Sequence, residues 1–390
     1  MDLSDSSDSY ILTRYLYIKD EVELSFITAL LKKKNLQECY YWAFELYYSG
    51  FDIVKLLWKI YFDFYYELNP IMECYMIKKL SSLEDNEKQV QIAIMSVVRN
   101  IYRLKSSPNT FILRQYIKGD ILPSVVYVES DNKFHKLLQS FEDQHIGDVC
   151  YYIKELLDTT DVNDIIKSLN IKSLNQPTTL YRTCPLHYLL AVICRLQAPV
   201  SSLNKCNIFV KPNEADIDFI HKVEHEPIPI IHKRGFDIEQ TYTTLGFKRY
   251  FKIGETIGSF KLARWSLSNN KDKHEDNYKY LDFLKLNWFH WEYYAATGSP
   301  LWCERLANYN GTLDHTKQDI VFLNDQSKEE FYNLYAYEFD EQPNEIIMMS
   351  HCDLEKSTWQ DWYFDVFPSL VDGDVPSAAL AFNTEQQWIY

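Results

Sequence analysis

Glycine and proline are scarce in this chain, and their scarcity narrows the fold. Ten glycines and thirteen prolines stand among 390 residues, which is about half of their usual combined share. Because these residues interrupt helices and form tight turns, an all-β sandwich with many turns is disfavoured. Long, uninterrupted helices are favoured instead.

Basic residues are also in the minority. The chain has 40 lysines and arginines against 55 aspartates and glutamates, and its formal net charge is −15. Binding to the phosphates of nucleic acids needs clustered cations, so a general nucleic-acid-binding function is disfavoured. An acidic surface favours basic partner proteins.

The chain lacks long hydrophobic runs. A membrane-spanning helix needs about 20 predominantly apolar residues. The most apolar stretch, residues 51–68, carries charged side chains at helical spacing, namely Asp52, Lys55, Lys59, Asp63 and Glu67. The stretch therefore predicts an amphipathic helix, and no association with a membrane is expected.

A disulfide framework is missing as well. The eight cysteines include no CxxC pair and show no regular spacing. The sequence opens without the pattern of a secretory signal peptide. Reduced thiols in a cytoplasmic protein are therefore expected.

Helical periodicity is the strongest signal that is present. Apolar residues within 26–31 predict a helix, and three lysines at 32–34 suit the negative end of its dipole. Asn35 then predicts the N-cap of a second helix, with Glu38 as its capping-box partner. Gly50 predicts a left-handed residue at the end of that second helix.

The same periodicity continues along the chain. Short connections between the early helices imply antiparallel neighbours. The predicted fold is mainly α, with stacked antiparallel helical hairpins in a bundle or a HEAT-like array, and with an irregular, partly extended central segment. Further helices are predicted at residues 54–68, 90–101, 180–196, 276–296, 325–337 and 358–367.

Composition divides the chain into five predicted parts. Eight of its 23 glycines and prolines fall within residues 199–259, which predicts an irregular junction or lasso segment there. The parts are a disordered tip at 1–9, an N-terminal helical domain at 10–198, the irregular segment at 199–259, a C-terminal aromatic-rich helical domain at 260–367 and an acidic tail at 368–390.

Two pairs of cysteine and histidine residues raise the question of a metal. Cys184 with His187, and His221 with His225, would supply four zinc ligands if the two segments met in space. The order His-Lys-Val-Glu-His differs from the HExxH motif of zinc enzymes, and Pro227 follows it almost at once. Surface histidines are the favoured interpretation, and no metal or other cofactor is expected.

Catalytic motifs are absent from the sequence. There is no nucleophile elbow, and Gly254 and Gly258 precede Lys261 without the GK[ST] order of a Walker loop. A nucleophile also needs a base that a third group orients, and no such combination stands out. The chain is therefore predicted to be non-enzymatic, with no catalytic residue.

Tryptophans concentrate in the last third of the chain. Seven of the nine lie there, namely Trp265, Trp288, Trp291, Trp302, Trp359, Trp362 and Trp388. Core filling is the favoured interpretation of these aromatic residues, while stacking on nucleic-acid bases is the alternative. The tail ends in Trp388, Ile389 and Tyr390, which is typical of a docking peptide. These three residues, together with Trp359 and Trp362, are the predicted partner-binding residues.

Several segments resemble one viral family. They are residues 25–51, similar to its opening helical hairpin, residues 287–311 with Ser-Pro-Leu-Trp, an arginine and Tyr-Asn-Gly, residues 335–346 with Asp-Glu-Gln-Pro, and residues 358–363. The family consists of uncharacterised conserved proteins of nucleocytoplasmic large DNA viruses, those that infect algae and amoebae. It carries no established activity, so the resemblance implies a source and assigns no residue a role.

Together these features predict a non-enzymatic interaction or scaffold protein of giant-virus replication, gene expression or particle assembly. It is expected in the host cytoplasm, within the virus factory or associated with the virion, and its expected partners are basic viral or host proteins. The alternative is an RNA- or nucleotide-binding factor that stacks bases on its C-terminal tryptophans.

Overall fold

The computed structural model confirms the mainly α fold class. Among the residues that it describes, the one sheet has two strands, and no helix is long and apolar enough to cross a membrane. The described residues are 11, 13–14, 19–80, 86–118, 132–143, 146–157, 160, 162, 164–165, 184–197, 209–224, 298–317, 319–334 and 359–367.

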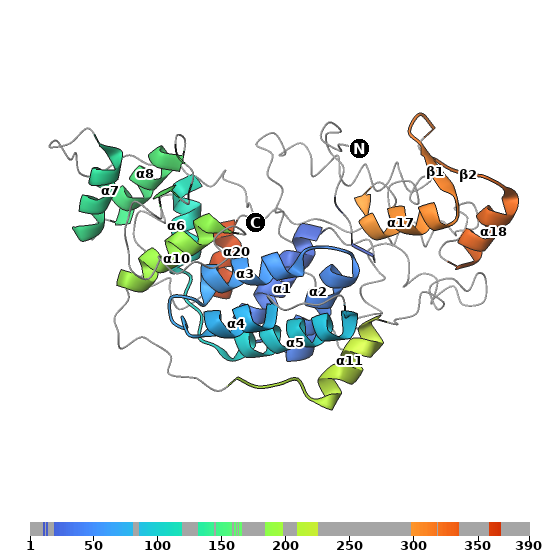
Figure 1. The fold of residues 1–390 in the computed structure, drawn as a ribbon, viewed down its shortest axis with the longest axis horizontal. Helices are drawn as coiled ribbons and strands as arrows, with labels where there is room; N and C mark the ends of the chain where they lie inside the picture. The colour runs from blue at the N-terminus through green and yellow to red at the C-terminus, as the bar shows by residue number, and fades with distance from the viewer. Residues whose placement is uncertain are drawn as a thin grey trace. The chain divides into compact units, whose positions relative to one another are not determined.

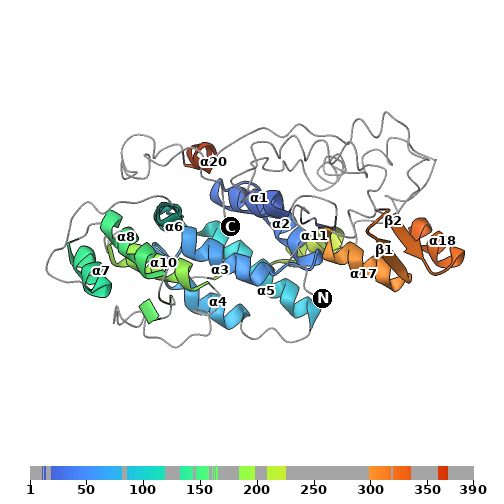
Figure 2. The ribbon, with the colours of Figure 1, turned by 90° about the horizontal axis from the view of Figure 1, so that it is seen from above.

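The elements drawn in Figures 1 and 2 belong to two compact units. The first unit joins the described residues before Ile53 to those from Asn213 to Val366, and the second holds those from Ile53 to Pro212 together with Phe367. The units therefore divide the chain differently from the predicted N-terminal domain at 10–198. The first two helices thus belong to the same unit as helices from the later part of the chain.

The first unit begins with two helices that pack against each other, α1 (Lys19–Leu31) and α2 (Leu36–Tyr48). Asn35 caps α2, since its Oδ1 accepts a hydrogen bond from the Gln37 amide at 2.9 Å. The predicted N-cap is therefore confirmed. The capping-box role of Glu38 is wrong, because its carboxylate accepts from the side chains of Lys34 and Trp42 instead.

Both helices end on a left-handed residue. Gly50 follows α2 with φ +80°, as predicted, and Lys33 follows α1 with φ +51°. Beyond Lys33, the Lys34 amide donates to the Ala29 carbonyl at 3.1 Å, which is the long bond of a Schellman motif. A residue with a β-carbon is held in this conformation at a cost of about 1 kcal/mol.

A helix lies inside the segment predicted to be irregular, residues 199–259. α11 (Glu214–Glu224) packs against α2. The Asp216 amide donates to Asn213 Oδ1 at 2.9 Å, and the Asn213 amide donates to Asp216 Oδ2 at 2.8 Å. This reciprocal capping box starts the helix despite the prolines nearby, so the irregular assignment is wrong for these residues. Much of the remaining segment lies outside the described residues.

The later part of the first unit is a helix, a β-hairpin and a helix. A β-carbon on Gly311 would lie 2.1 Å from Leu306 Cδ1, so any other residue there would force the Leu306 side chain to move. The rings of Phe322 and Phe331 pack at 5.3 Å between centroids. The sequence pattern predicts the second helix but not the hairpin. The elements are α17 (Pro300–Asn308), β1 (Gly311–Asp314), β2 (Asp319–Phe322), which is antiparallel to β1, and α18 (Asp325–Leu334).

The second unit consists of helices, and α3 lies in its centre. Nine of the twelve residues of α3 (Ile53–Phe64) are buried, and this helix contacts α5 (Glu87–Arg103), α6 (Asn109–Lys118) and α10 (Pro185–Gln197). Phe64 stacks on Phe111 of α6 at 5.3 Å between ring centroids. The helices predicted at 54–68, 90–101 and 180–196 are confirmed with shifted ends.

Sequence neighbours also pack together within the second unit. α4 (Met72–Leu80) contacts α5, and α7 (Lys133–Glu142) contacts α8 (Ile146–Leu157). The views in Figures 1 and 2 agree that α7 and α8 lie side by side. A regular stack of antiparallel hairpins stays a prediction.

Candidate partner-binding site

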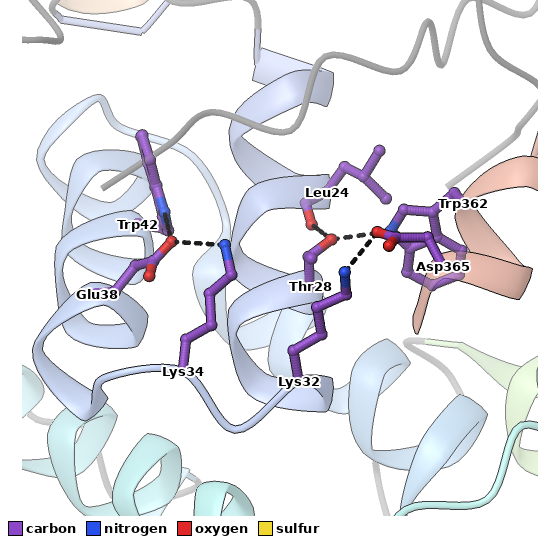
Figure 3. Close-up of polar contacts among 8 residues, drawn as sticks. All are labelled: Leu24, Thr28, Lys32, Lys34, Glu38, Trp42, Trp362 and Asp365. Carbon is purple, nitrogen blue, oxygen red and sulfur yellow. Dashed lines mark hydrogen bonds and ion pairs between the residues drawn. The ribbon is translucent and has the colours of Figure 1, made fainter. Parts of the chain in front are cut away.

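One of the predicted partner-binding residues, Trp362, lies in a contact within the chain. It belongs to α20 (Trp359–Val366), a short helix that packs on α1 in the first unit (Figure 3). The Trp362 side chain is fully buried, and its indole Nε1 donates a hydrogen bond to Thr28 Oγ1 at 2.8 Å. Trp362 therefore contacts α1 of its own chain instead of being presented to solvent.

A hydrogen bond within α1 orients the Thr28 hydroxyl for this contact. Its hydroxyl donates to the Leu24 carbonyl one turn earlier, at 2.7 Å, a common bond of threonine within helices. With the hydroxyl proton directed at Leu24, the oxygen lone pairs remain for the Trp362 indole. Figure 3 shows the Thr28 hydroxyl between the Leu24 carbonyl and the Trp362 indole.

An ion pair lies at the edge of the same contact. Lys32 Nζ donates to Asp365 Oδ2 at 2.5 Å, and the two side chains are 29% and 47% exposed. Asp365 stands three residues after Trp362, so both project from α20 toward α1, as Figure 3 shows. A pair this exposed contributes about 0.2–1 kcal/mol to stability.

Two further side chains of α20 are also buried. Tyr363 is 2% exposed and Val366 8% exposed. Burial raises the pKa of Tyr363 to about 12, which keeps its hydroxyl neutral. α20 thus contacts α1 through one buried hydrogen bond and one partly exposed ion pair, and the side chains of Tyr363 and Val366 are buried as well.

A second polar cluster borders this contact on α2. Glu38 Oε1 accepts from Lys34 Nζ at 3.3 Å and from Trp42 Nε1 at 3.5 Å (Figure 3). Together with Lys32, these residues surround the turn between α1 and α2. Two of the three lysines that follow α1 are thus paired with carboxylates, Lys32 with Asp365 and Lys34 with Glu38.

A second tryptophan from the last third of the chain also bonds to its beginning. Trp302 of α17 is 3% exposed, and its Nε1 donates to the Arg14 carbonyl at 2.9 Å. The Arg14 guanidinium donates to Glu45 Oε2 on α2 and to the Val223 carbonyl near the end of α11, each at 2.9 Å. Arg14 therefore connects α2, α11 and α17 in the first unit.

The predicted tryptophan stacking on bases finds no support in these two residues. The indoles of Trp302 and Trp362 are buried, and both N–H groups are bonded inside the chain. The Trp359 side chain and the terminal residues Trp388, Ile389 and Tyr390 lie outside the described part of the structure, so the partner-binding role assigned to them stays a prediction.

The second unit contains a buried ion pair at its centre. Asp63 of α3 accepts from Arg114 of α6, with Nη2 to Oδ2 at 2.7 Å and Nε to Oδ1 at 3.2 Å. The side chains are 0% and 2% exposed. His187 Nε2 of α10 lies 3.9 Å from Asp63 Oδ2. No local sequence pattern marks Arg114, because its partner lies 51 residues earlier.

Glu67 is a second buried acid of this unit. The Ser107 hydroxyl donates to its Oε2 at 2.6 Å, and the Asn109 amide donates to its Oε1 at 2.9 Å. Burial raises the pKa of Glu67, and these two hydrogen bonds act in the opposite direction. The carboxylate connects the chain after α3 to the start of α6 and therefore has a structural role.

The four residues considered for zinc do not form a site among the described residues. Burial, with a smaller effect of nearby Asp63, raises the pKa of Cys184 to about 12, which disfavours the thiolate that zinc requires. His221 is exposed and lies 3.5 Å from Glu224, while His225 is outside the described residues. In the described part of the chain no three residues of the metal-binding types are grouped.

The comparisons with known proteins add no identity to this geometry. No protein family, no curated protein and no solved structure matches the chain significantly. What the contacts define is a mainly helical protein in which one short aromatic helix is bound by another helix. Thr28, Lys32 and Arg14 carry these contacts and were not predicted, since their partners lie hundreds of residues away.

Proposed function

We propose that the protein is a non-enzymatic interaction or scaffold protein of giant-virus replication, gene expression or particle assembly. The observation that carries the proposal is the contact between α1 and α20, in which one helix binds a short aromatic helix through a buried tryptophan and an ion pair. Recognition of a short amphipathic helix through its apolar face is a common mode of protein–protein binding.

The buried state of several cysteines supports a role in binding. Burial raises the pKa values of Cys39, Cys150, Cys184 and Cys194, which favours the unreactive thiol. Asp63 and Glu67 are engaged in hydrogen bonds that join helices. The hydrogen bonds of Asp63 and Glu67 hold helices of the second unit together, and such a stable helical framework suits a scaffold.

Charge and lineage specify the proposed partners and place. A net charge of −15 favours basic viral or host proteins as partners. The resemblance to proteins of large DNA viruses supports the host cytoplasm as the location, in the virus factory or with the virion.

Affinity purification of the tagged protein from infected cells tests this proposal. We expect protein partners in stoichiometric amounts that survive nuclease treatment. Loss of all partners with nuclease, with RNA left as the bound molecule, would contradict the scaffold function and favour base stacking by the tryptophans outside the described residues.

A truncated chain is the matched control for the tail. The predicted docking role of Trp388, Ile389 and Tyr390 requires that removal of residues 374–390 weakens the recovery of at least one partner. An unchanged set of partners at unchanged yield would show that the tail is dispensable for binding.

A further inference from the structure

α20 is too short to be stable as a helix by itself. It has eight residues, and isolated helices shorter than about 12 residues are marginal in water. Its helical form is therefore maintained by packing within the folded chain, which includes the contact with α1. In that contact, α20 has the size and the chemistry of a bound peptide.

The α1 surface is organised before α20 binds. The Thr28 oxygen is oriented by its bond to the Leu24 carbonyl within α1, and Lys32 follows directly at the end of the helix. Neither feature depends on which copy of the chain supplies Trp362 and Asp365. Any α20 that reaches this surface finds the same acceptor and the same cation.

The connection to α20 is long enough to reach another molecule. Residues 335–358, which separate α18 from α20, number 24. A chain of this length spans at most about 80 Å. The covalent connection therefore does not restrict α20 to the α1 of its own chain.

We propose that α20 of one copy binds α1 of a second copy, and that two chains form a dimer by reciprocal exchange of α20. α20 of a second copy suits the α1 surface because the α20 sequence already makes specific contacts there. These are the burial of Trp362, its hydrogen bond to Thr28 and the ion pair of Lys32 with Asp365. Exchange of identical elements reproduces native contacts without a new interface, which makes it a low-cost route to dimers. The dimer rests on the proposed function only in its treatment of α1 as a helix-binding surface.

Reversal of the ion pair in separate chains provides the test. In Lys32→Asp alone and in Asp365→Lys alone, an α20 bound in cis or in a homodimer places like charges together. In a mixture of the two variants, a heterodimer places opposite charges together at both sites. Because both side chains are partly exposed, these changes leave the folded core intact.

We expect the dimer population in the mixture to be at least about tenfold higher than in either variant alone. In the heterodimer, two repulsions are replaced by two attractions of an exposed pair. Native mass spectrometry of the full-length chains, with one variant labelled with ¹⁵N, measures this population. The double variant Lys32→Asp/Asp365→Lys is the matched control, and its dimer fraction should return to that of the wild type.

A second measurement uses the wild-type chain. Labelled and unlabelled wild-type proteins should form mixed dimers whose fraction increases with concentration, and a synthetic peptide of residues 357–368 should reduce that fraction. A mixture of the charge variants that stays monomeric at every concentration overturns the exchange. So does a dimer that is indifferent to these charges and to the peptide, and neither result bears on partners recovered from infected cells.

Discussion

Replacement of Arg114 by methionine should destabilise the second unit strongly. Arg114 and Asp63 are 2% and 0% exposed and form a bidentate pair, with the shortest contact at 2.7 Å. Methionine keeps much of the side-chain volume but leaves the Asp63 carboxylate without its guanidinium partner. Removal of one partner from a buried ion pair costs about 3–5 kcal/mol.

The pH dependence of this loss tests the reasoning further. Desolvation raises the pKa of a buried carboxyl that has lost its partner, so in Arg114→Met the penalty grows as the pH rises above the unfolded value of about 4. At pH 5 the variant should therefore recover at least about 1 kcal/mol relative to pH 8. Asp63→Asn leaves a guanidinium that stays charged at both pH values, and its loss should not recover.

Hydrogen–deuterium exchange of peptides from α3 and α6 measures these changes within the second unit. The double variant Asp63→Leu/Arg114→Met is the control, because replacement of both charges by apolar groups is often close to neutral. A loss below about 1 kcal/mol in Arg114→Met at pH 8, or the same loss at pH 5 as in Asp63→Asn, would refute the assignment of a stabilising buried pair.

Three further predictions concern single positions. Burial raises the pKa of Glu73 to about 7, so the folded state loses stability as the pH rises from about 4.5 to about 7. Glu73→Gln should therefore stabilise the protein by about 1–3 kcal/mol at pH 8 and not at pH 4. Thermal melts at both pH values check this. Lys33 has φ +51°, so Lys33→Gly should stabilise the first unit by about 0.5–1 kcal/mol, whereas Gly50→Ala should destabilise it; equal effects in denaturant titrations would contradict this. Trp302→Phe removes the donor to the buried Arg14 carbonyl, which should cost about 1–3 kcal/mol and accelerate tryptic cleavage after Arg14, and cleavage at the wild-type rate would oppose it.

Local signals predicted the described elements well where cause and effect lie close in sequence. The Asn35 cap and the left-handed Gly50 are confirmed, because each depends on a few neighbouring residues. The same logic applies to Asn213 and Asp216, whose capping box starts α11. That capping signal is present in the sequence, but the nearby prolines and glycines predicted an irregular segment instead.

Glu38 shows where a local rule failed. Its position three residues after an N-cap predicts a capping box, but Lys34 and Trp42 supply competing donors. The β1–β2 hairpin was not predicted for a different reason. Its strands have four residues each, too few to show a clear alternation of apolar and polar residues.

The sequence by itself determined the class of the fold, because helical periodicity, caps and the scarcity of glycine and proline act within a few residues. Tertiary structure alone decided that Trp362 bonds to Thr28, that Trp302 bonds to Arg14 and that Asp63 pairs with Arg114. The partners in the first two contacts are 334 and 288 residues apart. No local sequence pattern predicts contacts between residues so far apart along the chain, because these contacts form only when helices with buried faces pack together.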